Sequence, residues 1–135
     1  MSKVRFGIVG IGQMGGSHAE WLANGQVDNA VLTAVCDVNP QKKEWAAEKL
    51  PENVKFFDNY IDMLESGEID AVLIATPHYD HPVIAMEALN RDLHTLVEKP
   101  AGVYTKKVRE MNELAESKPH LVFGMMFNQR TNPLY

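Results

Sequence analysis

The amino-acid sequence predicts a doubly wound α/β fold, in which helices cover both faces of a parallel sheet of about six strands. Two observations lead to this prediction. Apolar runs of strand length alternate with stretches of helical periodicity along the chain. Several of these runs are apolar on both faces, which is typical of strands that helices cover on both sides. The alternation indicates right-handed crossovers within a single sheet.

The expected strands are short and rich in Val, Ile, Phe and Thr, which have high β propensity. They comprise residues 4–10, 30–36, 54–57, 71–76, 94–97 and 121–126. The chain has 135 residues, of which 45% are hydrophobic, so it can bury one sizeable core. We therefore expect one domain over residues 1–125.

Two helices are expected before the third strand. Residues 14–24 have apolar side chains at roughly helical spacing, and Gly25 follows as a stop signal. The helix after the second strand begins with Asn39 as N-cap and Pro40 at the first helical position. The asparagine oxygen can accept a backbone hydrogen bond there, and proline lacks only a donor that the first turn does not use.

Three further helices complete the expected alternation. One lies within residues 59–67 and has Asn59 as its N-cap. Another spans residues 81–90 and has a proline near its start, and the last spans residues 105–117 with Thr105 as its cap.

Composition excludes several classes of function. The net charge of −5 argues against a nucleic-acid partner and against binding to an anionic membrane. The single cysteine, Cys36, excludes a disulfide scaffold within the chain and suits a small core residue. Because neither a secretory signal nor a membrane span is recognisable, we expect a cytoplasmic protein.

The first expected strand runs into GIGQMG, a G-x-G-x-x-G pattern that opens a helix. In this context the first glycine permits a tight turn, the second lets the backbone approach a pyrophosphate, and the third lets helix and strand pack closely. The helix N-terminus favours phosphate through its free N–H groups and its dipole. The candidate cofactor-binding residues of this Rossmann-type turn are Gly10, Ile11, Gly12, Gln13, Met14 and Gly15.

Asp37 ends the second expected strand, roughly 20 residues after the glycine turn, where dinucleotide-binding folds carry an acid. Its carboxylate can accept both hydroxyl hydrogens of an adenosine ribose and would repel a 2′-phosphate, which favours NAD. Lys42 and Lys43 follow closely and leave NADP possible. The alternative is that the glycines serve only the turn and Asp37 only caps the next helix.

The fourth expected strand ends in ATPHYDHP, at the edge of the sheet where ligands of such folds bind. Ala75, Thr76 and Pro77 are candidates for the wall of a cofactor site. His78 and His81 are candidates for cofactor contact, and His81 also suits the cap of the next helix. A metal pair is conceivable but lacks a third ligand nearby, so we expect no metal site.

The fifth expected strand ends in LVEKPAG, where Glu98, Lys99 and Pro100 follow an apolar run directly. Successive side chains point to opposite faces of a strand, so Glu98 and Lys99 cannot share one environment. One interpretation is a solvated strand end. The other is that Lys99 lies beside the nicotinamide, where its surroundings could lower its pKa into the range useful for proton transfer.

These motifs together resemble the Gfo/Idh/MocA family of nicotinamide-dependent oxidoreductases, which act mostly on sugars, inositols and related polyols. The resemblance covers GIGQMG, Asp37, ATPHYDH, EKP and GMMFNQRTNP, and so essentially the whole chain. It implies that Lys99 assists substrate binding and proton transfer, and that Glu98 lies on the cofactor side. It also implies a cofactor contact at Asn128. His78 departs from the family, which often has asparagine at this position.

The resemblance further implies that residues 126–135 begin the connection to a substrate domain that supplies further catalytic residues and most of a homo-oligomer interface. The 135 residues would then be a cofactor domain that does not turn over substrate alone. The expected ligands are NAD and, in the full-length protein, a small polyol or sugar. An NAD(H)-sensing module without catalysis is the alternative, whereas S-adenosylmethionine binding would leave Lys99 without a task.

Overall fold

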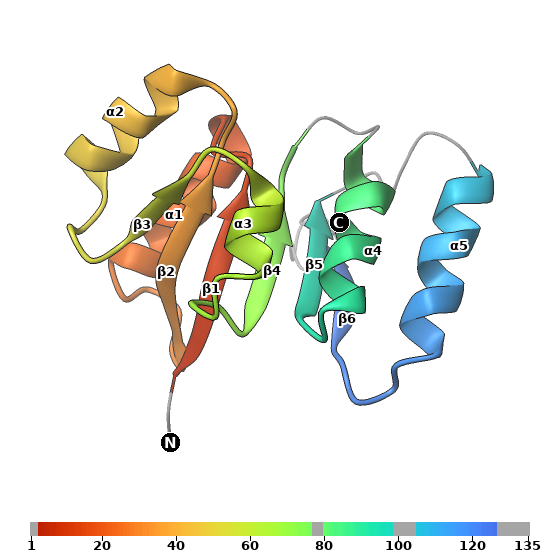
Figure 1. Cartoon of the computed structure of the whole chain (residues 1–135). Coiled ribbons are helices and arrows are strands. Elements are labelled where there is room, and N and C mark those ends of the chain that lie inside the picture. Colours follow the sequence, from red (N-terminus) through yellow and green to blue (C-terminus); the bar gives the residue numbers. More distant parts are fainter. Residues whose placement is uncertain (1–2, 77–79, 99–104, 127–135) are drawn as a thin grey trace, which may run out of the picture.

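Six parallel strands form the centre of the protein (Figure 1). The computed structural model describes residues 3–76, 80–98 and 105–126. The strands are β1 (Val4–Val9), β2 (Ala30–Cys36), β3 (Lys55–Phe57), β4 (Ala71–Ile74), β5 (His94–Glu98) and β6 (Phe123–Met126). Their order in the sheet is β3-β2-β1-β4-β5-β6, and every neighbouring pair is parallel. The predicted doubly wound sheet is therefore confirmed.

Within the described residues, five helices connect the strands and cover the sheet on both faces (Figure 1). They are α1 (Gln13–Ala23), α2 (Pro40–Lys49), α3 (Tyr60–Leu64), α4 (His81–Asn90) and α5 (Thr105–Glu116). Residues of α1 and α2 belong to one buried cluster, which includes Leu22 and Ala46. Residues of α3, α4 and α5 belong to the other cluster, which includes Met63, Ile84 and Met111. The two clusters are the two layers that a doubly wound sheet needs.

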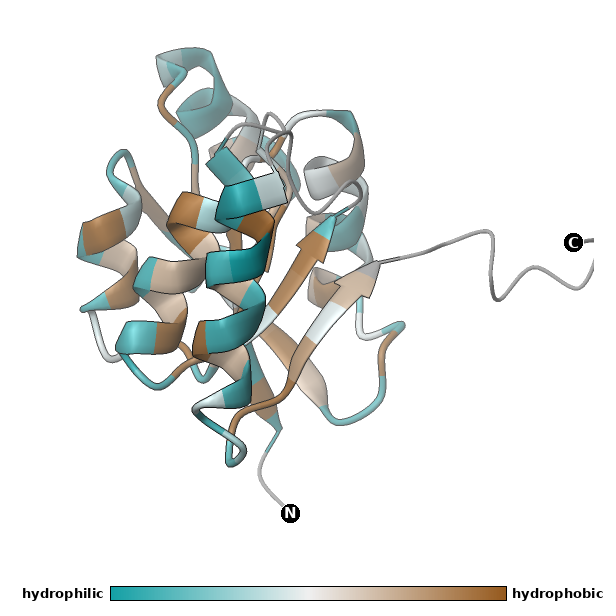
Figure 2. Cartoon of the chain, turned by 90° about the vertical axis from the view of Figure 1, so that its right-hand side faces the viewer, coloured by the Kyte–Doolittle hydropathy of each residue, from teal (hydrophilic) through white to brown (hydrophobic). Residues whose placement is uncertain are grey.

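Hydrophobic residues are concentrated in the strands, whereas α5 presents mostly polar residues to the viewer in Figure 2. The central strands β1 and β4 are nearly inaccessible at their carboxyl ends, with Ile8 and Ile74 completely buried. This burial on both faces explains why their sequences are continuous apolar runs and not alternating ones. The same carboxyl ends carry the candidate site.

The predicted asparagine caps are confirmed. The side-chain oxygen of Asn39 accepts a hydrogen bond from the Gln41 N–H at 3.0 Å and begins α2. Asn59 accepts one from the Ile61 N–H at 2.8 Å and begins α3. Gly25 follows α1 with a φ of 74°, the left-handed conformation that suits glycine beyond a helix end.

Two predicted caps are wrong. Thr105 is the first residue of α5 itself, and the position before it lies outside the described residues. His81 lies inside the first turn of α4, whereas Asp80 occupies the N-cap position without a side-chain bond to the helix. His81 is 1% exposed, and its Nε2 lies 2.8 Å from the Thr76 carbonyl oxygen. Burial against the preceding strand end therefore prevents it from capping.

Arg5 at the start of β1 pairs with Asp70, which precedes β4, through guanidinium contacts of 2.9 and 3.2 Å. The Arg5 hydrogen bonds hold the pKa of the Asp70 carboxyl below its ordinary value of 3.8. A carboxyl whose pKa is lowered by folding stabilises the protein above its ordinary pKa and loses this contribution as the pH falls through the lowered value. Both side chains are more than two fifths exposed, so the effect is small.

We expect Asp70→Asn to lower the melting temperature at pH 7 and to have progressively less effect below about pH 4. Thermal denaturation of both proteins, followed by circular dichroism from pH 7 to pH 2.5, measures the difference. A difference that stays constant over this range would show that the charge of Asp70 does not contribute.

Candidate functional site

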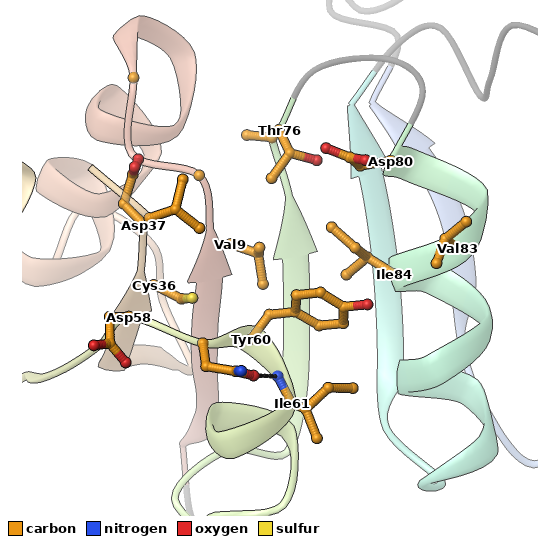
Figure 3. A pocket seen from close by; sticks show the side chains of 15 residues that line it. Val9, Cys36, Asp37, Asp58, Tyr60, Ile61, Thr76, Asp80, Val83 and Ile84 are labelled. Carbon is orange, nitrogen blue, oxygen red and sulfur yellow. Dashed lines mark hydrogen bonds between the residues drawn. The ribbon is translucent and has the colours of Figure 1, made fainter.

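A cavity of about 660 Å³ opens at the carboxyl ends of β1, β2 and β4, where the strand order reverses (Figure 3). Parallel sheets bind ligands at such a switch point. Five segments of the chain line it: the end of β1 with the glycine turn, the end of β2, the β3–α3 connection with the start of α3, the end of β4, and the first turn of α4. The lining residues are Val9, Gly10, Gly12, Cys36, Asp37, Val38, Asp58, Asn59, Tyr60, Ile61, Ala75, Thr76, Asp80, Val83 and Ile84.

The glycine turn has the tight packing that the G-x-G-x-x-G pattern predicts. Gly10 has a φ of 90°, and a Cβ atom there would lie 2.8 Å from the carbonyl oxygen of Ala75. A Cβ atom on Gly15 would collide with the carbonyl oxygen of Gly10. Gly12 differs, since no atom lies within 4 Å of its Cβ position. The turn therefore has no room for a side chain at Gly10 or Gly15, whereas the space at Gly12, beside the cavity, is open.

Asp37 connects the end of β2 to this turn. Its Oδ2 accepts a hydrogen bond from the Ile11 N–H at 3.0 Å, and its Oδ1 accepts one from the Asn39 N–H at 2.9 Å. Each carboxylate oxygen has two lone pairs, so both oxygens keep acceptor capacity for a ligand. Figure 3 shows the Asp37 side chain at the cavity wall.

The end of β4 contributes a hydroxyl that has no partner. Among the described residues, Thr76 Oγ1 is buried without a hydrogen-bond partner, and Thr76 lines the cavity. The Ala75 N–H donates to the carbonyl oxygen of Val9 at 2.8 Å, which joins this strand end to the glycine turn. An unpaired buried hydroxyl costs free energy, so a polar ligand group at Thr76 would be favourable.

The cavity has an acidic wall. Asp37, Asp58 and Asp80 line it, and none of the described lining residues is basic. Burial, together with the nearby carboxylates of Asp37, Asp58 and Asp62, raises the pKa of the Cys36 thiol to about 12. Cys36 is therefore a neutral wall residue. An anionic ligand group would find no cationic side chain among the described residues that line the cavity.

The predicted site residues do not all meet at this cavity. Ile11 is buried beneath the turn and takes part through its N–H, whereas Gln13 and Met14 are exposed on α1. Glu98 lies at the end of β5 and pairs with His18. Pro77, His78, Lys99 and Asn128 lie outside the described residues.

Sequence reasoning missed the wall that Asp58, Tyr60, Ile61, Val83 and Ile84 form (Figure 3). A signal existed for its first part, because the carboxyl end of β3 must lie at the same edge of the sheet as that of β2. The α4 residues gave no such signal. They face the cavity because α4 packs over β4 and β5.

No group of three His, Cys, Asp or Glu side chains suited to a metal ion occurs within the described residues. Over the same ranges, no helix is both long enough and apolar enough to span a lipid bilayer.

The fold and the site define the class of protein: a dinucleotide-binding domain with a glycine turn at the start of α1 and an acid at the end of β2. Comparison with known proteins gives the family. The chain belongs to the Gfo/Idh/MocA oxidoreductases, and residues 4–125 match their NAD-binding Rossmann fold.

Three known proteins illustrate the similarity. The rhizopine catabolism protein MocA of Rhizobium meliloti is 35% identical over 92% of this chain and 38% of its own length. The crystal structure of myo-inositol 2-dehydrogenase from Lactobacillus plantarum superposes with a TM-score of 0.92 at 32% identity, over 98% of this chain and 38% of that one. The scyllo-inositol dehydrogenase from Lactobacillus casei, with bound NAD(H) and scyllo-inositol, gives 0.92 at 30% identity with the same coverage. The chain thus spans about two fifths of these relatives.

Proposed function

We propose that this chain is the cofactor-binding part of an NAD-dependent dehydrogenase that acts on a polyol or sugar. One observation carries the proposal: the glycine turn, Asp37 and the unpartnered Thr76 hydroxyl converge on one cavity at the switch point of the sheet. The inositol substrates of the structurally similar dehydrogenases support the choice of a polyol.

The adenosine half of NAD would occupy the cavity, with its ribose hydroxyls on Asp37 and its pyrophosphate over Gly12 at the start of α1. The opening at Gly12 and the spare acceptor capacity of Asp37 support this placement. The strand order then directs the nicotinamide half toward the ends of β4 and β5, which lie on the other side of β1 from β2.

When bound, NAD supplies the hydride acceptor for oxidation of a secondary alcohol. Lys99 directly follows Glu98, the last residue of β5, and this neighbourhood in the sequence supports a role for Lys99 in the nicotinamide half. We assign to it the binding and deprotonation of the substrate hydroxyl. Of the remaining predicted residues, Pro77, His78 and Asn128 are proposed as further cofactor contacts.

The wider assignments are proposals of the same kind. Residues 1–125 form the cofactor domain, and residues 126–135 begin the connection to a substrate domain. The complete enzyme is a homo-oligomer in the cytoplasm, where a buried free thiol such as Cys36 stays reduced.

Titration with NADH tests the central proposal. Trp45 lies beside the first turn of α1, where its ring is 3.5 Å from the Cβ position of Gly16, so bound NADH should quench its fluorescence by energy transfer. We expect NADH to bind at least about tenfold more tightly than NADPH, because the described cavity wall has three carboxylates and no cation for a 2′-phosphate. Absence of binding at millimolar NADH would contradict the proposal.

The Asp37→Asn variant is the matched control for this preference. It keeps the size of the side chain and one acceptor oxygen but removes the charge. We expect this variant to bind NADH about tenfold more weakly, and the ratio of its affinities for NADH and NADPH to be close to one. An unchanged ratio would show that Asp37 does not select the cofactor.

A further inference from the structure

One nearly buried side-chain contact spans the two halves of the proposed site. Glu98 is the last residue of β5, and its Oε1 lies 2.7 Å from the Nε2 of His18 on α1. The side chains of His18 and Glu98 are only 12% and 13% exposed. Eighty positions separate them in the sequence. We propose that His18 is a positioning residue that holds the end of β5, and with it the nicotinamide half of the cofactor site, in place against α1.

The physical need for such a partner follows from the burial of Glu98. A buried carboxylate without a hydrogen-bond donor is costly, because it loses its hydration. A carboxylate only accepts hydrogen bonds, so the ring Nε2–H of His18 donates to it. The imidazole ring also contacts Trp21 edge to face, with ring centroids 5.4 Å apart, which restricts its rotation. The donor is therefore held in a defined direction.

The position of the contact gives it a functional meaning. His18 stands about one turn beyond Gly15 on α1, whose N-terminus carries the glycine turn. Glu98 directly precedes Lys99, to which the proposed function assigns proton transfer. The contact therefore links the pyrophosphate end of the site to the reacting end. Loss of the donor would free the end of β5 while the Asp37–Ile11 bond still holds the adenosine half.

This inference rests on the proposed function, and two ligands separate the two ideas. ADP-ribose shares the adenosine, pyrophosphate and second ribose with NADH but lacks the nicotinamide. We expect His18→Ala to weaken NADH binding by about tenfold and to leave ADP-ribose binding within about threefold, as measured by isothermal titration calorimetry. ADP-ribose binding also reports that the variant is folded.

Two conservative variants of His18 test the same inference even if His18→Ala does not fold. The amide nitrogen of glutamine can take the place of imidazole Nε2, so His18→Gln should restore NADH affinity to within about threefold of the unaltered chain. His18→Asn is too short to reach Glu98 and should not restore it. His120→Ala is the matched control. That exposed histidine contacts Asp92 at 3.4 Å, in the loops that precede β5 and β6, and its loss should change neither affinity.

The binding results distinguish failure of the role assigned to His18 from failure of the proposed function. Equal weakening of NADH and ADP-ribose by His18→Ala would reduce His18 to a general structural residue. Unchanged binding of both ligands, or equal behaviour of the glutamine and asparagine variants, would also overturn the inference and leave the proposed function standing. Failure of the unaltered chain to bind either ligand would overturn the proposed function itself.

Discussion

Gly15→Ala is expected to destabilise the protein and to abolish measurable NADH binding. The added Cβ atom would collide with the backbone carbonyl oxygen of Gly10, and this oxygen cannot move without opening the turn. Gly10 itself is held against the Ala75 backbone, so the strain spreads to the end of β4. Overpacking of this kind costs about 3 kcal/mol at the upper end of its usual range. Urea denaturation and NADH titration measure the two effects.

The neighbouring Gly16 offers a matched control. A Cβ atom there would lie 3.5 Å from the Ile11 carbonyl oxygen and from the Trp45 ring, which is ordinary contact. Gly16→Ala should therefore keep the stability or raise it by about 0.5 kcal/mol, since alanine favours the helix. Equal stability of Gly15→Ala and Gly16→Ala would contradict the expected clash between a side chain at position 15 and the Gly10 carbonyl oxygen.

Lys99→Ala is expected to lower the turnover of the complete enzyme by a factor of about 10² to 10⁴, the usual contribution of a positioned general base. Affinity for NADH should stay within a few fold, because the proposed adenosine and pyrophosphate contacts are assigned to other residues. The assay follows NADH formation with an inositol as substrate, in a protein that carries this chain together with a substrate domain. Lys99→Arg keeps the positive charge, but a guanidinium group does not give up its proton and so cannot serve as the base. Compared with Lys99→Ala, it should therefore restore substrate affinity but not turnover.

Unchanged turnover of Lys99→Ala would remove the residue from the mechanism. Loss of NADH affinity equal to the loss of turnover would make Lys99 a cofactor ligand and not a base.

Much of the fold could be predicted because the signals are local. The apolar period indicated each strand and helix, and Asn39 and Asn59 begin their helices by bonding N–H groups two positions ahead. The cap assigned to His81 failed for a different reason. Cap preference is a local property, but burial of His81 against Thr76 depends on how α4 packs on the sheet.

An irregularity in β2 illustrates the same limit. The register between β1 and β2 shifts after Phe6, so that Thr33 has no partner opposite, and its hydroxyl donates to the Glu68 carbonyl oxygen at 2.8 Å. Nothing in the apolar pattern of residues 30–36 indicates this shift. It is accompanied by a hydrogen bond to a residue that lies 35 positions away in the sequence.

The sequence by itself determined the class of fold, the glycine turn and the acid at the end of β2, because backbone geometry and hydrophobic period act over a few residues. Only the tertiary structure decided what surrounds them. The cavity wall at Tyr60 and Ile84 and the contact between His18 and Glu98 exist because the strand order brings distant segments to one edge of the sheet. Such contacts are set by packing between elements, and no local pattern encodes them.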